Sequence, residues 1–180
     1  MNTLLDPQTF DQKLRELTGE APLVRPFLCE GSPFECEIFL VGINPGKSSG
    51  FWPHWNALRG CDKRGWLQDY LAEHGRYSPT RERIERLFKA LGPLRCLETN
   101  IYTFPSRRES DLDAAHRDTR VFDFLLKTIR PRLLFVHGNS AVQHLARLTK
   151  SDLSRGQFTA VSYCGVAFDV FAGHHLSYQW

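Results

Sequence analysis

Residues 36–46, with the sequence CEIFLVGINPG, decide the fold class of this chain. The first six are mostly apolar and include β-branched and aromatic side chains, which is typical of a buried strand. Asn44-Pro45-Gly46 ends this strand sharply, because proline fixes its own φ and moves the preceding residue out of the α region. The side chain of Asn44 is therefore expected at the carboxyl end of a central strand, where open α/β sheets bind their ligands. The alternative interpretation is that Asn44-Pro45-Gly46 forms an ordinary turn after a strand, without a ligand site.

The segments around this strand alternate between helical and strand patterns. Apolar residues at helical spacing predict helices at 7–18, 63–73, 81–91, 111–129 and 140–149. Short apolar runs predict further strands at 94–102 and 133–137, with a hairpin or two sheet strands at 158–171. This order predicts an α/β fold, a three-layer α-β-α sandwich around a central, mainly parallel sheet of four or five strands. Residues 20–35 are expected to be irregular.

Length and composition are those of an ordinary globular domain. The chain has 180 residues, of which 42% are hydrophobic and 24% charged, and its formal net charge is +3. We expect a single domain over residues 1–180, monomeric and cytoplasmic. No stretch approaches the ~20 apolar residues of a membrane helix, and the N-terminus lacks a signal-peptide pattern. The five cysteines form no C-x-x-C pair and are expected to be free thiols.

Polar side chains follow several of the predicted strands. Asn44, Asn100 and His137 each stand at a strand end, and His174-His175 follow the last strand. Because loops after parallel strands converge on one edge of a sheet, these side chains are expected to share a crevice. A carboxamide pairs well with the edge of a nucleobase, and an imidazole can donate to an anion that develops on a leaving group. His137 is also readily explained as a core histidine.

Four segments together resemble a known family. Residues 42–49 (GINPGKSS) resemble the first motif of the mismatch-specific branch of the uracil-DNA glycosylase superfamily, G-I-N-P-G followed by S-S. Residues 99–105 (TNIYTFP) resemble the T-N-V-V-K-x-x-P segment of its thermophile-type branch. Residues 129–141 are similar to that branch's helix end, strand and G-x-x-A helix start. Residues 173–177 (GHHLS) fall where the family has its H-P-S motif.

The resemblance implies a DNA glycosylase-like hydrolase that cleaves the N-glycosidic bond of uracil or a related damaged or mismatched base in DNA, as in base excision repair. It implies that Asn44 orients the attacking water and that the Ile43 backbone touches the base. Asn100 would pair with the uracil edge and exclude cytosine. His175 would bond the carbonyl oxygen that gains charge, because it keeps the H-x-S spacing, with His174 as the alternative.

The resemblance also implies contacts to the base stack and to phosphates. Leu176 would fill the space that the extruded base leaves, and one of three aromatic residues would stack on the base. Spacing does not choose among Phe51, Trp52 and Trp55. Phosphate contacts are expected from basic and hydroxyl side chains on the crevice loops, namely Lys47, Ser48, Arg107, Arg108 and Ser177.

Two features depart from the family pattern. The second motif lacks its proline, and Cys29 and Cys36 are seven residues apart where the thermophile-type branch has a close cysteine pair. We therefore expect no iron-sulfur cluster, no metal and no other cofactor. The altered motif favours one alternative, that the chain is a catalytically weak or inactive relative that binds nucleic acid or nucleotides. A hydrolase of free nucleosides is a further alternative.

Overall fold

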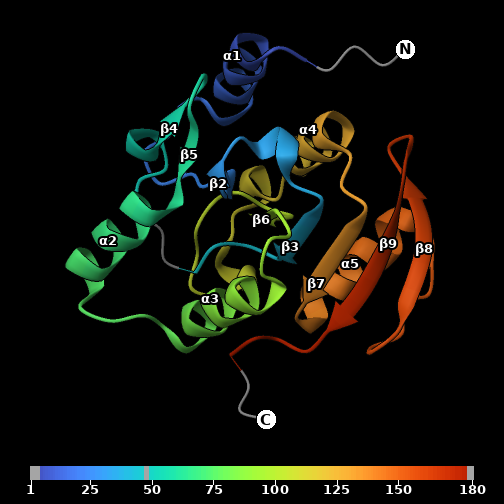
Figure 1. Ribbon diagram of the computed structural model, residues 1–180. Helices are drawn as coiled ribbons and strands as arrows, with labels where there is room; N and C mark the ends of the chain where they lie inside the picture. Colours follow the sequence, from blue (N-terminus) through green and yellow to red (C-terminus); the bar gives the residue numbers. More distant parts are fainter. Residues whose placement is uncertain (1–4, 47–48, 178–180) are drawn as a thin grey trace.

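The computed structural model describes residues 5–46 and 49–177, and its centre is the strand β3 (Ile38–Gly42), all five residues of which are buried. β3 belongs to a six-stranded sheet with the order β1-β6-β3-β7-β9-β8 (Figure 1). The other strands of this sheet are β1 (Phe27–Leu28), β6 (Cys96–Asn100), β7 (Leu133–His137), β8 (Phe158–Tyr163) and β9 (Val166–Gly173). A small second sheet contains β2 (Glu30–Gly31), β5 (Gly60–Asp62) and β4 (Trp55–Asn56).

The central part of the large sheet is parallel, as the sequence predicts. β6, β3, β7 and β9 pair in parallel, whereas β1 and β8 pair antiparallel at the two edges. Six strands are present where the sequence predicts four or five. The additional strand is β1, which lies in the segment expected to be irregular. Its two residues are too few to produce a recognisable alternation, and only their pairing with β6 makes them a strand.

Five α-helices accompany the sheet within the described residues: α1 (Pro7–Thr18), α2 (Lys63–His74), α3 (Pro79–Leu91), α4 (Arg120–Ile129) and α5 (Asn139–Thr149). α1 begins as predicted, because the Asp6 side chain accepts hydrogen bonds from the backbone N–H groups of Gln8 and Thr9. α3 begins in the same way at Ser78, whose hydroxyl accepts from the N–H of Arg81. The start of α1 is therefore as predicted, whereas α3 begins at Pro79, two residues before the predicted start at residue 81.

The helix predicted over 111–129 is too long. Only α4 forms there, and the segment before it contains two short 3-10 helices, η3 (Glu109–Asp111) and η4 (Ala114–His116). The side chain of Arg117 donates to the backbone carbonyl oxygens of Leu112 and Glu109. Such bonds from a side chain to the backbone compete with a continuous helix and hold this segment as a structured loop.

The long segment predicted as a loop after Gly46 is also partly ordered, because it contributes η2 (Trp52–His54), β4 and β5. These elements and α2 lie on the opposite side of the molecule from β8 and β9 (Figure 1). Among the described residues, no helix has the length and apolar character needed to cross a membrane.

Phe39, in the middle of β3, provides a test of the core. Its side chain is fully buried, so Phe39→Ala is expected to lower the free energy of unfolding by about 3–5 kcal/mol, through lost burial and the cavity left behind. Urea denaturation measures this loss. Phe158→Ala is the matched control, because Phe158 is 69% exposed on the edge strand β8. Equal losses of unfolding free energy in the two variants would contradict the placement of β3 at the centre of the core.

Candidate functional site

A cavity of about 640 Å³ lies at the carboxyl ends of the central strands. Gly42, Asn100 and His137 are the last residues of β3, β6 and β7, and all three line it. Among its other lining residues are several of those predicted from the sequence, namely Ile43, Asn44, Arg107, Arg108 and His175. Segments that are far apart along the chain therefore meet around one space, as expected for the edge of a parallel sheet.

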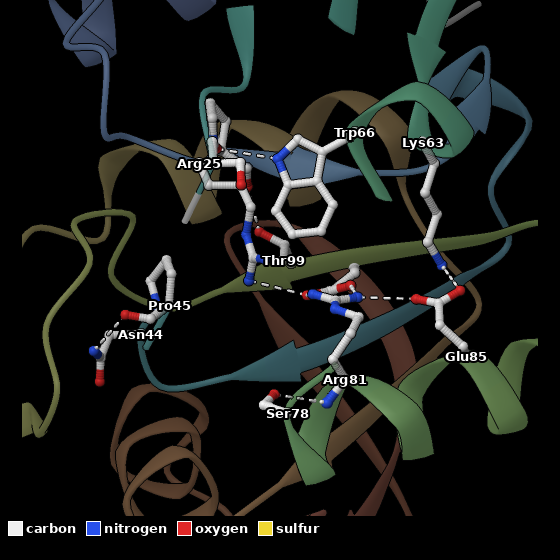
Figure 2. Close-up of polar contacts among 12 residues, drawn as sticks. Arg25, Asn44, Pro45, Lys63, Trp66, Ser78, Arg81, Glu85 and Thr99 are labelled. Atoms are coloured by element: carbon white, nitrogen blue, oxygen red, sulfur yellow. Dashed lines mark hydrogen bonds and ion pairs between the residues drawn. The ribbon is translucent and has the colours of Figure 1, made fainter. Parts of the chain in front are cut away.

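The Asn44 carboxamide is held in one orientation. Its Nδ2 donates to the Ser106 carbonyl oxygen and hydroxyl, both at 3.0 Å, and to the Pro45 carbonyl oxygen at 3.1 Å. The Ser106 hydroxyl in turn donates to the Arg108 carbonyl oxygen. Figure 2 shows the bond to Pro45 and the amide oxygen of Asn44 pointing away from it. With Nδ2 engaged, Oδ1 is the atom of this amide that is placed to accept a hydrogen bond from a ligand.

Asn100 lies against Gly42, its partner in the β3–β6 register. A Cβ atom on Gly42 would stand 2.7 Å from Asn100 Oδ1, so only glycine fits there without displacing the amide. Asn100 is 5% exposed, and its buried Nδ2 has no hydrogen-bond partner among residues 5–46 and 49–177. A buried donor of this kind is costly unless a ligand satisfies it. Asn100 therefore has a free donor in the cavity wall.

His175 is the histidine of the 174–175 pair that lines the cavity. Its Nδ1 accepts the backbone N–H of Ser177 at 3.1 Å and lies 2.6 Å from the Ser177 hydroxyl. A neutral ring that accepts at Nδ1 carries its proton on Nε2 and so acts as a donor there. Burial lowers the pKa of His175, which favours this neutral form. His174 is exposed, within 3.5 Å of the Arg155 guanidinium, and does not line the cavity.

The aromatic residues predicted to stack on a base lie elsewhere. Phe51 is fully buried and packs against Phe27 at a centroid distance of 5.0 Å. Trp55 Nε1 donates to Asp11, and Trp52 packs under the Arg15 guanidinium. None of the three is among the residues lining the cavity. The expectation is thereby corrected, because these rings are needed to fill the core between α1 and the large sheet. Among the described residues, the tyrosine that lines the cavity is Tyr70 of α2.

The predicted wedge is also corrected. The Leu176 side chain is buried and clusters with Leu40 and Ile84, so it is not available to enter a base stack. Its carbonyl oxygen accepts from Arg83, which fixes the segment after β9 against α3. Among the expected phosphate contacts, Arg107 and Arg108 are exposed at the cavity and Ser177 is exposed beside His175, whereas Lys47 and Ser48 lie outside the described residues.

A buried charge network forms one side of the cavity. Glu98, two residues before Asn100, accepts from Arg81 at 2.5 and 2.6 Å and from Arg25 at 2.9 Å. Arg81 also pairs with Glu85, which binds Lys63 at 2.9 Å (Figure 2). Of this network, Arg25, Arg81 and Glu98 line the cavity, and together they leave one positive charge in excess there. Among groups this deeply buried, such an excess favours an anionic ligand.

The charge network is packed around Trp66. The guanidinium carbons of Arg25 and Arg81 lie 5.3 and 5.0 Å from the centroid of its ring. Burial alone would raise the pKa of Glu98, but Arg81 and Arg25 together hold it well below its usual range. Glu98 is therefore ionised at neutral pH and fixes two arginines at the cavity.

No local sequence pattern singles out this network or Ser106. Arg25 lies in a segment expected to be irregular, and Arg81 belongs to a helix whose charged side chains suggest a solvated face. The one available signal is Glu98 itself, because a carboxylate inside a predicted central strand requires a buried partner. Which residue supplies that partner is settled by tertiary packing.

The described residues contain no group of three or more histidine, cysteine or acidic side chains that could hold a metal ion. Comparison of the chain with protein-family models and with curated protein sequences finds no match. The chemistry of the cavity itself is therefore the basis for assigning a function.

Glu98 provides a test of the charge network. Glu98→Gln leaves two arginines buried without their carboxylate and is expected to lower the free energy of unfolding at pH 7 by about 3–5 kcal/mol. Because the folded pKa of Glu98 is depressed, its contribution is present above the unfolded pKa, near 4.5, and is lost as pH falls below it. The difference between wild type and Glu98→Gln should therefore narrow below about pH 4.5.

Chemical denaturation at a series of pH values measures this difference. The control is Glu37→Gln, because Glu37 is 53% exposed and lies 3.9 Å from Arg132. A pH-independent difference for Glu98→Gln, or an equally large effect of Glu37→Gln, would show that Glu98 is not the buried anchor described here.

Proposed function

We propose that the protein is a DNA glycosylase-like hydrolase that cleaves the N-glycosidic bond of uracil, or of a related damaged or mismatched base, in DNA. The observation that carries this proposal is the convergence of Asn44, Asn100 and His175 on one cavity. These residues come from three distant segments, each of which resembles a glycosylase motif. We also propose that the helices and the large sheet form the three-layer α-β-α sandwich of that superfamily.

In the proposed reaction, water adds across the bond between the sugar C1′ and the base nitrogen. A C–O bond forms, the C–N bond breaks, and the base leaves as an anion that takes up the proton lost by the water. Asn44 Oδ1 would orient the water, because Nδ2 is engaged by Ser106 and Pro45. An amide cannot accept the proton at neutral pH, so turnover should be slow and should depend on a good leaving group.

Base recognition would use polar atoms of Asn100 and His175 in the cavity wall. The Asn100 amide offers a donor and an acceptor to the imide edge of uracil, whereas the amino group of cytosine would place a donor against Nδ2. Nε2 of His175 would donate to the carbonyl oxygen that gains negative charge. The excess positive charge among the buried network residues would also favour the anion. Arg107 and Arg108 would contact phosphates of the flanking DNA.

A binding module without catalysis is the second candidate. The observation that favours it is the burial of Leu176, since a glycosylase that extrudes its base from a duplex needs something to fill the gap. Single-stranded DNA, in which no stack has to be filled, separates the two candidates. Cleavage of a single-stranded uracil oligonucleotide supports the enzyme, whereas binding without cleavage supports the module.

Removal of the two proposed reactive side chains provides the central test. Asn44→Ala and His175→Ala are each expected to reduce cleavage of a uracil-containing oligonucleotide by roughly 100-fold or more, because each removes an interaction formed in the transition state. Alkaline scission of the abasic product measures the rate. His174→Ala is the matched control and should retain wild-type activity. Undiminished cleavage by both Asn44→Ala and His175→Ala would refute the proposed roles.

Ser106 is proposed as a positioning residue for Asn44. Ser106→Ala removes the hydroxyl that accepts from Asn44 Nδ2 but leaves the backbone carbonyl, so kcat is expected to fall about 10-fold while KM stays nearly constant. Single-turnover kinetics separates the two parameters. Ser106→Thr should restore most of the rate. A change in KM alone would indicate that Ser106 contacts the substrate instead.

A further inference from the structure

His137 is a buried imidazole in the cavity wall that the proposed reaction does not use. It ends β7, is 7% exposed and lines the cavity. Its Nδ1 is buried and has no hydrogen-bond partner in the part of the chain that the structure describes. An imidazole that only filled the core would be expected to have its nitrogens satisfied by the protein.

The sheet register puts His137 between the two groups proposed to recognise the base. The strand order β6-β3-β7-β9 places it between Asn100, at the end of β6, and His175, which follows β9. A Cβ atom on Gly42 would stand 2.7 Å from Asn100 Oδ1 and 3.3 Å from His137 Nε2, so both polar atoms border the same space. The rings of His137 and His175 meet edge to face, with centroids 5.4 Å apart.

The polar wall of the cavity is thus a continuous series of one amide and two imidazoles. Burial, and next to it the neighbouring His175, lower the pKa of His137 to about 4, so its ring is neutral at physiological pH. A neutral imidazole has one N–H donor, and a carbonyl oxygen accepts two hydrogen bonds. Two imidazoles can therefore donate hydrogen bonds to one ligand oxygen.

We propose that His137 is a further ligand-contacting residue, which donates a hydrogen bond to the same carbonyl oxygen of a cyclic imide as His175 does. This inference rests on the function proposed above for the same cavity. It assigns Asn100 to one carbonyl and the N–H of the imide, and the two histidines to the other carbonyl. The site would then recognise the whole edge of a pyrimidine-2,4-dione, and the two imidazoles would share the charge that develops on one oxygen.

Binding of free bases tests the inference without requiring catalysis. His137→Leu is expected to weaken binding of uracil and of 4-thiouracil about 10-fold or more, because a hydrogen bond to a ligand carbonyl is lost. It should change binding of 2-thiouracil far less, because the proposal places the two histidines at the carbonyl at position 2, where sulfur is a poor acceptor. His137→Gln, which keeps a donor, should restore part of the affinity for uracil.

The matched control is His144→Leu. His144 is also a partly buried histidine with an unsatisfied ring nitrogen, but its Nδ1 lies 3.1 Å from the Tyr102 hydroxyl and it does not line the cavity. Its substitution should leave the affinity for uracil unchanged. Thermal unfolding of each variant verifies that it is folded. If His137→Leu does not fold, the ¹⁵N resonances of His137 in the wild-type protein provide the readout, and they should shift on addition of uracil.

The outcomes distinguish this inference from the proposed function. In one outcome the wild type cleaves uracil-containing DNA while His137→Leu has the same uracil affinity and the same kcat. That result would overturn the inference and leave the glycosylase proposal standing. Uracil binding that depends on His137, without cleavage, would support the inference and favour the binding module. Absence of uracil binding at millimolar concentration, or unshifted His137 resonances on saturation with uracil, would overturn the inference.

Discussion

The parallel pairing of β3 with β6 on one side and β7 on the other is the constraint on which the cavity depends. In-register pairing aligns Asn100 with Gly42, and His137 with Gly173 on β9. Each of these residues ends its strand, so their positions are set by backbone hydrogen bonds and not by mobile loops. Asn44 follows two residues beyond Gly42, where Ser106 holds its amide. The sheet therefore fixes the relative positions of Gly42, Asn100 and His137, and the loops add Asn44 and His175.

The charge network reinforces this edge of the sheet. Side chains two residues apart on a strand point to the same face, so Glu98 anchors Arg25 and Arg81 on the face that presents Asn100. Burying so many charges costs solvation energy, which the short ion pairs and the packing on Trp66 offset. A core of apolar side chains would be simpler to stabilise. A protein that retains buried cations beside a cavity gains a site biased toward negative charge.

Several helices and strands can be predicted from the sequence because their signals are local. Asp6-Pro7 predicts the start of α1 and the apolar run before Asn44 predicts β3, since both signals depend on neighbours along the chain. The prediction of one helix over 111–129 is wrong, because hydrogen bonds from the Arg117 side chain to the loop backbone compete with helical backbone hydrogen bonds. The edge strand β1 cannot be predicted from the sequence, because two residues are too few to show an alternating pattern. Its partner strand β6 lies about 70 residues away in the chain.

Local sequence patterns are enough to predict the alternation of strands and helices, and with it the sheet edge where Asn44, Asn100, His137 and His175 meet. Which of the remaining side chains face that space depends on tertiary packing. The side chains of Phe51, Trp55 and Leu176 are buried in the core, where the burial of their apolar surface stabilises the fold. Arg25 and Arg81, which no sequence pattern places there, line the cavity instead. Their partners are distant in the chain, and no local pattern encodes which distant residue satisfies a buried charge or leaves a buried nitrogen open to a ligand.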